Sequence, residues 1–147
     1  RRHQIERIRV MPTIGNLILW RGIYETDGRF HVDGIRLGLS GPHRVFAGPA
    51  VQKFQADECA SISEKTRVCQ NIDGFSHFAD GYVFAYTKEP LVIGDLRYSM
   101  LPHEIEPLWG LVVDPKNPEK RSELKYFDQI EPKTLKAFWQ MLTGAYP

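Results

Sequence analysis

The stretch "NLILWRGIYETDGRFHVDGIRLGL", residues 16–39, predicts a β-hairpin. Two runs rich in β-branched and aromatic residues are joined by Asp27-Gly28, a dipeptide that favours the positive φ angles of a type I′ turn. A two-residue loop fixes the strand register. On one face the predicted cross-strand pairs are Tyr24 with His31, Gly22 with Asp33, and Trp20 with Ile35.

The opposite face of this hairpin is mostly apolar but contains two arginines. It comprises Leu19, Arg21, Ile23, Phe30, Val32, Gly34 and Arg36. Gly34 has no side chain and leaves space beside Arg21. Because a buried guanidinium needs a partner, we expect Arg21 and Arg36 to meet an acceptor or an acidic group.

Further strands and two helices follow the hairpin. Residues 40–60 contain Gly41-Pro42 and Gly48-Pro49, which predict a loop with at most a short helix around Gln52. A capping-box pattern at Ser61–Glu64 and apolar residues at helical spacing predict a helix over 62–79, ended by Asp80-Gly81. Alternating patterns predict four strands, at 82–89, 90–98, 107–114 and 124–130.

The chain ends in a predicted amphipathic helix from Pro132 to about Thr143. Its apolar residues recur at i, i+3, i+4 and i+7 and should pack on the sheet. These residues are Leu135, Phe138, Trp139 and Leu142. Together the elements predict one α+β domain over residues 1–147, a mostly antiparallel sheet of about six strands with two packed helices.

The bulk composition excludes some partners. A net charge of +1 and a pI of about 8.0 give no global field that would attract nucleic acid. No stretch approaches the roughly 18 apolar residues of a membrane span. Cys59 and Cys69, if they flank or lie in one helix, are too far apart for a disulfide, so we expect unpaired thiols and a reducing compartment.

The start of the chain, "RRHQIERIRV", has two interpretations. Four arginines against one glutamate within nine residues are typical of a segment just beyond the cytoplasmic end of a membrane helix. A basic strand edge or terminus in water has the same composition.

The sequence contains no recognisable catalytic or metal-binding motif. The five histidines have no HxH, HxxxH or HExxH spacing, there is no CxxC pair, and the glycines form no phosphate-binding loop. The stretch "VIGDLRYSMLPHEIEPLWG", residues 92–110, instead places Asp95, Arg97 and Tyr98 close together. On an extended strand Asp95 and Arg97 point to the same face.

If the face bearing Asp95 and Arg97 meets the hairpin face, one carboxylate lies among three guanidinium groups, those of Arg21, Arg36 and Arg97. The excess positive charge would then need Glu104, Glu106 or a bound anion. A structural network of ion pairs is the alternative interpretation of the same residues.

Residues in both regions resemble those of a known family. The matching residues are Pro12, Gly15-Asn16, Trp20-Arg21, Asp95, Arg97-Tyr98, Pro102 and Leu108-Trp109-Gly110. Over residues 8–114 the chain resembles the soluble C-terminal part of the inner-membrane-associated metal-dependent hydrolases of bacteria. The resemblance implies that membrane helices precede this chain and contain the histidines and acidic residues that would bind a divalent metal, with none bound here. It further implies an inner-membrane protein whose soluble domain, by the arginine-rich start, faces the cytoplasm.

Two functions follow from these patterns. In the first, the domain completes a hydrolase site in the membrane part, Arg21, Arg36 and Arg97 hold an anionic group of a small-molecule substrate near Asp95, and Tyr98 donates a hydrogen bond. In the second, the domain is a non-catalytic module that stabilises its own membrane helices or docks a partner through exposed aromatic residues. Those aromatic residues would be Trp20, Tyr24 or Trp109.

Overall fold

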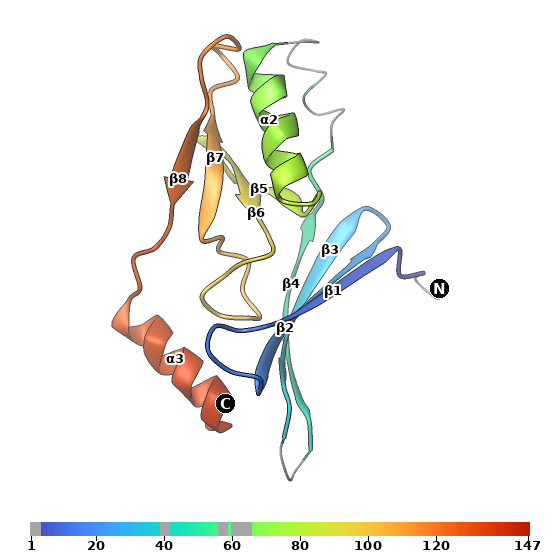
Figure 1. Cartoon of the computed structure of the whole chain (residues 1–147), viewed down its shortest axis with the longest axis vertical. Helices are drawn as coiled ribbons and strands as arrows, with labels where there is room; N and C mark the ends of the chain where they lie inside the picture. Colours follow the sequence, from blue (N-terminus) through green and yellow to red (C-terminus); the bar gives the residue numbers. More distant parts are fainter. Residues whose placement is uncertain (1–3, 39–41, 56–58, 60–65) are drawn as a thin grey trace. The chain divides into compact units, whose positions relative to one another are not determined.

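The chain is α+β, as predicted, with two helices and two antiparallel four-stranded sheets in the part that the structure describes (Figure 1). This structure is a computed structural model and describes residues 4–38, 42–55, 59 and 66–147. The prediction of one sheet with about six strands was wrong, because eight strands divide equally between two sheets. The elements are β1 (Arg7–Pro12), β2 (Leu19–Thr26), β3 (Arg29–Arg36), β4 (Arg44–Gln52), α2 (Arg67–Phe78), β5 (Val83–Lys88), β6 (Leu91–Asp95), β7 (Trp109–Val113), β8 (Glu123–Tyr126) and α3 (Pro132–Thr143).

Contacts divide the chain into two compact units, each built on one sheet. Unit one comprises Arg1–Val51, Ser99–Ile105 and Gln129–Pro147, and contains the sheet β1-β2-β3-β4 with helix α3. Unit two comprises Gln52–Tyr98 and Glu106–Asp128, and contains the sheet β5-β6-β7-β8 with helix α2. That residues 1–147 form a single domain stays a prediction.

The hairpin β2–β3 has the predicted register. Tyr24 pairs with His31, Gly22 with Asp33, and Trp20 with Ile35. The turn residues Asp27 and Gly28 have φ angles of 51° and 70°, the two positive values that a type I′ turn requires. The predicted inner face is buried, since Leu19, Ile23, Phe30 and Val32 are all 0 % exposed.

Strands β1 and β4 are the edges of this sheet. Strand β1 contains part of the arginine-rich start and is a basic edge strand, one of the two interpretations of that segment. It pairs with β2 so that Ile8 is opposite Tyr24 and Val10 is opposite Gly22. The loop predicted over residues 40–60 was wrong for 44–52, which form β4. Pro49 is tolerated there because an edge strand leaves one side of its backbone without strand partners.

Gly48 of β4 is required by close packing in unit one. A Cβ at this position would lie 2.0 Å from the His103 carbonyl oxygen and 2.7 Å from that of Val32. The glycine that suggests a loop in the sequence therefore lets the backbones of β3 and of the segment around His103 approach β4 closely.

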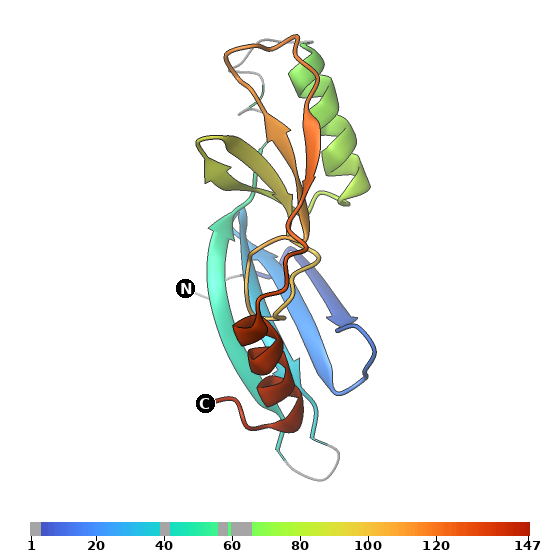
Figure 2. The ribbon, with the colours of Figure 1, turned by 90° about the vertical axis from the view of Figure 1, so that its left-hand side faces the viewer.

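Helix α3 has the predicted bounds and buries part of the predicted apolar face. Met141 is fully buried and forms a core with Leu19, Phe46 and Leu101, against which Ala137, Phe138 and Leu142 pack. Leu135 and Trp139 are 48 % and 56 % exposed, so half of the predicted apolar stripe faces solvent. Figure 2 shows α3 lying along the β1–β4 sheet, and Gly144, with φ 86°, ends the helix in a left-handed conformation.

In unit two, helix α2 covers one face of the second sheet. Val68, Ile72 and Phe75 of the helix form a core with Ile93 and Leu111, among other residues. The described helix begins at Arg67 and is capped by Thr66, and the predicted capping box at Ser61–Glu64 lies outside the described residues. The four predicted strands form β5 to β8, paired antiparallel in chain order.

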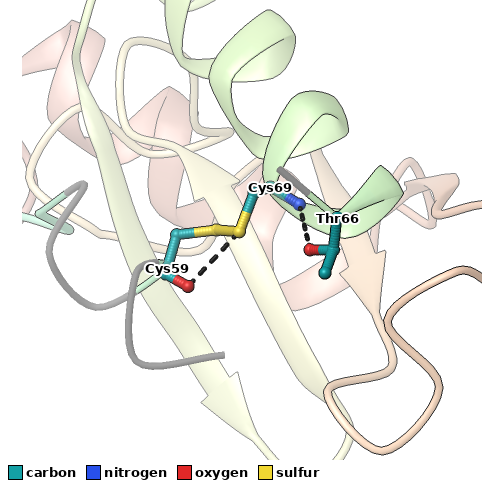
Figure 3. Close-up of a disulfide and its surroundings, with 3 residues drawn as sticks. All are labelled: Cys59, Thr66 and Cys69. Atoms are coloured by element: carbon teal, nitrogen blue, oxygen red, sulfur yellow. Dashed lines mark hydrogen bonds between the residues drawn. A yellow bond between two sulfur atoms is a disulfide. The ribbon is translucent and has the colours of Figure 1, made fainter. Parts of the chain in front are cut away.

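A disulfide joins Cys59 to Cys69, so the expectation of unpaired thiols was wrong (Figure 3). The expectation assumed that the two cysteines flank or lie in one helix, where a separation of ten residues corresponds to about 15 Å. Cys69 instead lies in the first turn of α2, which follows the Thr66 cap, and its Cα atom is 5.7 Å from that of Cys59. This distance lies within the range that a disulfide spans.

Neither described helix is long and apolar enough to cross a membrane.

Candidate functional site

The side chain of Asp95, at the end of β6 in unit two, is 0 % exposed and accepts several hydrogen bonds. Its Oδ1 accepts hydrogen bonds from the backbone N–H and the Nε of Arg97, both at 3.0 Å. Its Oδ2 accepts from an Arg97 terminal nitrogen at 2.8 Å and from Trp109 Nε1 at 3.1 Å. The carboxylate is therefore paired and hydrogen-bonded on both oxygens.

This contact was predicted, but the geometry that makes it was not. The sequence predicts that β6 continues to Tyr98, which places Asp95 and Arg97 two residues apart on one strand face. The strand ends at Asp95 because its carboxylate binds the backbone N–H of Arg97 and turns the chain. The guanidinium then folds back onto the same carboxylate in a bidentate pair.

Aromatic rings surround the Arg97 guanidinium. Its Cζ lies 5.3 Å from the ring centre of Phe78, at the end of α2, and 5.2 Å from that of Tyr98. The Tyr98 and Trp109 rings are 5.1 Å apart. Arg97 is 8 % exposed, whereas Phe78 and Tyr98 are 60 % and 37 % exposed, so the rings shield the ion pair from water.

The Asp95 carboxylate, through its hydrogen bonds, raises the pKa of Arg97 above the ordinary value, although burial acts in the opposite direction. The guanidinium therefore stays charged at any physiological pH. A group of this kind does not serve as a general acid or base.

Arg21 in unit one has backbone acceptors. It is 4 % exposed, and one of its terminal nitrogens donates to the carbonyl oxygens of Pro102 at 2.8 Å and Glu104 at 2.7 Å, with that of Leu101 at 3.4 Å. Its cross-strand neighbour is Gly34, as the sequence predicts. Arg21 thus holds the segment 101–104 against the inner face of the sheet.

Arg36 holds the end of α3 in the same unit. Its Nε donates to the Leu142 carbonyl oxygen at 3.0 Å. A Cβ at Gly144 would lie 3.2 Å from the Arg36 Cζ, which shows how closely the guanidinium fits under the end of the helix. A cation at this position is also favoured by the negative end of the helix dipole.

His103 is a titratable group that the sequence argument did not select. Its Nε2 lies 3.4 Å from the Tyr146 hydroxyl, and its Nδ1 is buried without a hydrogen-bond partner in the described part of the chain. Burial lowers the pKa of His103, the positive charge of Arg21 lowers it further, and Glu104 acts in the opposite direction. The sequence around His103 does not distinguish it from the other histidines, because the residues that surround it in the fold come from distant segments of the chain.

The predicted site residues therefore fall into two groups. Asp95, Arg97 and Tyr98 lie together in unit two, whereas Arg21 and Arg36 belong to unit one. Within the described ranges, no group of three or more histidine, cysteine, aspartate or glutamate side chains could hold a metal ion. No protein-family model, curated protein or solved structure matches the chain.

Proposed function

We propose that this chain is a non-catalytic, membrane-proximal binding module of a larger membrane protein. The observation that carries the proposal is the pairing of Asp95 with Arg97. A guanidinium that holds a substrate anion must offer donors and an uncompensated charge. Arg97 directs its donors at a carboxylate that is itself 0 % exposed.

The free energy of the pair argues in the same direction. Separating a buried ion pair costs about 3–5 kcal/mol, because one charge is left in a poorly solvated environment. A phosphate or carboxylate ligand would have to offset this cost before it gained any net affinity. Arg21, with its carbonyl acceptors at 2.7 and 2.8 Å, serves the fold in a comparable way.

The membrane-proximal location rests on the resemblance to the inner-membrane-associated hydrolase family. In this proposal the membrane helices of the same protein are the module's neighbours, and any divalent metal belongs to them. The disulfide between Cys59 and Cys69 favours an oxidising compartment, such as the periplasm. We therefore place the module on the periplasmic side, in preference to the cytoplasmic side that the arginine-rich start suggests.

A binding role is supported by the outer face of the β1–β4 sheet. Ile8 and Val10 of β1 are 63 % and 48 % exposed, and their cross-strand neighbours put them on the face that bears Trp20 and Tyr24. Trp20 and Tyr24 are half-buried, and exposed aliphatic side chains beside aromatic rings are typical of contact surfaces.

An anion titration tests the non-catalytic role. We expect phosphate, sulfate and acetate to raise the melting temperature of the 147-residue chain no more than chloride at the same ionic strength. Saturable stabilisation by phosphate that is lost in Arg97→Lys or Arg36→Lys would contradict the proposal. The full-length protein, assayed in detergent with divalent metals against phosphoester, ester and amide substrates, should keep any activity in a correctly folded Arg36→Lys variant.

One observation favours the enzymatic alternative, in which the domain helps to bind an anionic substrate group. Tyr98 is 37 % exposed beside Arg97, so its hydroxyl could reach a ligand. A Tyr98→Phe variant of the full-length protein that retains its fold and loses hydrolysis would support that alternative.

A further inference from the structure

The loop between β1 and β2 presents two aliphatic side chains to solvent. Ile14 is 86 % exposed and Leu17 is 72 % exposed, the two highest values among the exposed large hydrophobic residues that the structure describes. The loop extends beyond the ends of the two strands (Figure 2). Exposure of this degree is unfavourable in water, because an aliphatic side chain gains free energy when it moves from water into an apolar environment.

Hydrogen bonds inside the loop stabilise the conformation that exposes Ile14 and Leu17. The Asn16 Oδ1 accepts from the backbone N–H groups of Ile18 at 3.0 Å and Leu19 at 2.7 Å, and its Nδ2 donates to the Thr13 hydroxyl at 2.7 Å. The Thr13 N–H and hydroxyl both donate to the Leu19 carbonyl oxygen. Gly15, with φ 77°, provides the left-handed turn.

These bonds also prepare the loop for an environment without water. A backbone polar group costs free energy in an apolar medium unless it is already hydrogen-bonded. Asn16 and Thr13 satisfy several of the loop's donors internally, and the Leu17 carbonyl accepts from Trp20 Nε1 at 2.9 Å. The loop therefore offers aliphatic surface with much of its polar backbone already satisfied.

The residues around the loop are of the types found at the interface between water and a lipid bilayer. Trp20 lies at the base of the loop and belongs to the ring type that is enriched at the boundary between headgroups and acyl chains. Residues 1–20, which exclude the buried Arg21, contain four arginines and one glutamate, so the segment that bears the loop has a net charge of +3. This charge is complementary to anionic phospholipid headgroups.

We propose that the β1–β2 loop docks on an anionic lipid bilayer by inserting Ile14 and Leu17 among the acyl chains. The inference rests on the proposed binding function and identifies the partner as lipid. A protein partner would need a pocket that fits two protruding aliphatic side chains and a basic flank. A bilayer accepts the same features without any matching shape, which is why the observations favour lipid.

Vesicle co-sedimentation of the 147-residue chain tests the proposal. Vesicles of phosphatidylethanolamine with phosphatidylglycerol should bind the chain, and vesicles of phosphatidylcholine alone should bind it more weakly. The double variant Ile14→Ser/Leu17→Ser should weaken binding by about tenfold or more for each residue, from the burial free energy of an aliphatic side chain. The matched control is Leu124→Ser/Tyr126→Ser on β8, where the side chains are 48 % and 61 % exposed.

Loss of vesicle binding in the loop variant alone, with an unchanged circular dichroism spectrum, supports insertion. Equal loss in both double variants, or no binding by the parent chain, overturns it. A parent chain that dimerises in sedimentation equilibrium, and a loop variant that does not, would identify the loop as a contact between two copies and also overturn the lipid proposal. The non-catalytic role is tested separately, by the anion titration.

Discussion

The substitution Asp95→Asn tests whether the buried ion pair stabilises unit two. Asparagine has nearly the same shape and can still accept the hydrogen bond from the Arg97 backbone N–H through one oxygen. It removes the charge, and its NH₂ group would then face the two donors that now bind Oδ2, an Arg97 terminal nitrogen at 2.8 Å and Trp109 Nε1 at 3.1 Å.

The expected loss follows from burial. Exposed ion pairs contribute about 0–1 kcal/mol, whereas breaking a buried pair costs about 3–5 kcal/mol. Asp95 is 0 % exposed and Arg97 is 8 % exposed, so the buried case applies. Because asparagine keeps one acceptor, we expect the free energy of unfolding to fall by about 3 kcal/mol, near the lower end of that range.

Urea unfolding, followed by circular dichroism and tryptophan fluorescence, measures this loss. The exposed residue Asp128 provides a matched control, and Asp128→Asn should change the free energy of unfolding by less than about 0.5 kcal/mol. A cycle with Arg97→Met isolates the pair, and the double variant should be more stable than the sum of the single losses predicts. A loss below about 1 kcal/mol in Asp95→Asn, or additive effects in the cycle, would refute the structural role of the pair.

Three further changes test other parts of the fold. Cys59→Ser should lower the free energy of unfolding by about 2.7 kcal/mol, because the disulfide closes a loop over a separation of ten residues in the unfolded chain. Reduction of the parent chain should have the same effect. Two free thiols in the denatured, unreduced chain would disprove the disulfide. The pKa of His103 is lowered from about 6.5, so folding favours the neutral imidazole, and the contribution of His103 to stability is complete above pH 6.5 and is lost as the pH falls below that value. The His103→Gln variant should therefore show a melting temperature that depends less on pH in this range. Identical pH profiles for the variant and the parent chain would contradict the assignment. Gly48→Ala should lower the free energy of unfolding by about 3 kcal/mol or more, because the new Cβ would clash with two carbonyl oxygens. Gly74→Ala, in open space on α2, should raise the free energy of unfolding by about 0.5–1 kcal/mol. A tolerated Gly48→Ala would argue against the packing of β4.

The elements that the sequence predicts correctly are those whose cause is local. The β2–β3 register follows from the Asp27-Gly28 turn, and the bounds of α3 follow from Pro132 at its start and Gly144 after its end. The contact between Asp95 and Arg97 could also be predicted, because the two residues are only two positions apart in the chain.

The errors concern partners that are distant in the chain. Proline and glycine in residues 44–52 indicate a loop unless the edge position of β4 and the carbonyls facing Gly48 are known. The carbonyl acceptors of Arg21 come from residues about eighty positions later, so no local pattern could identify them. The orientation of α3, which buries Met141 and exposes Trp139, likewise depends on packing against Leu19 and Phe46.

Two four-stranded sheets have four outer strands, whereas one continuous sheet has two. Each outer strand is a template onto which another chain could add in fibrillar aggregation. All four carry features that oppose such growth: arginines alternate along β1, Pro49 interrupts β4, a bulge lies between Ala85 and Thr87 in β5, and Glu123 and Lys125 charge β8. With two separate sheets, the residues that prevent polymerisation must therefore occur at several places along the chain. We expect a substitution that removes a charge from β1 or β8 to make the protein insoluble before it destabilises the fold.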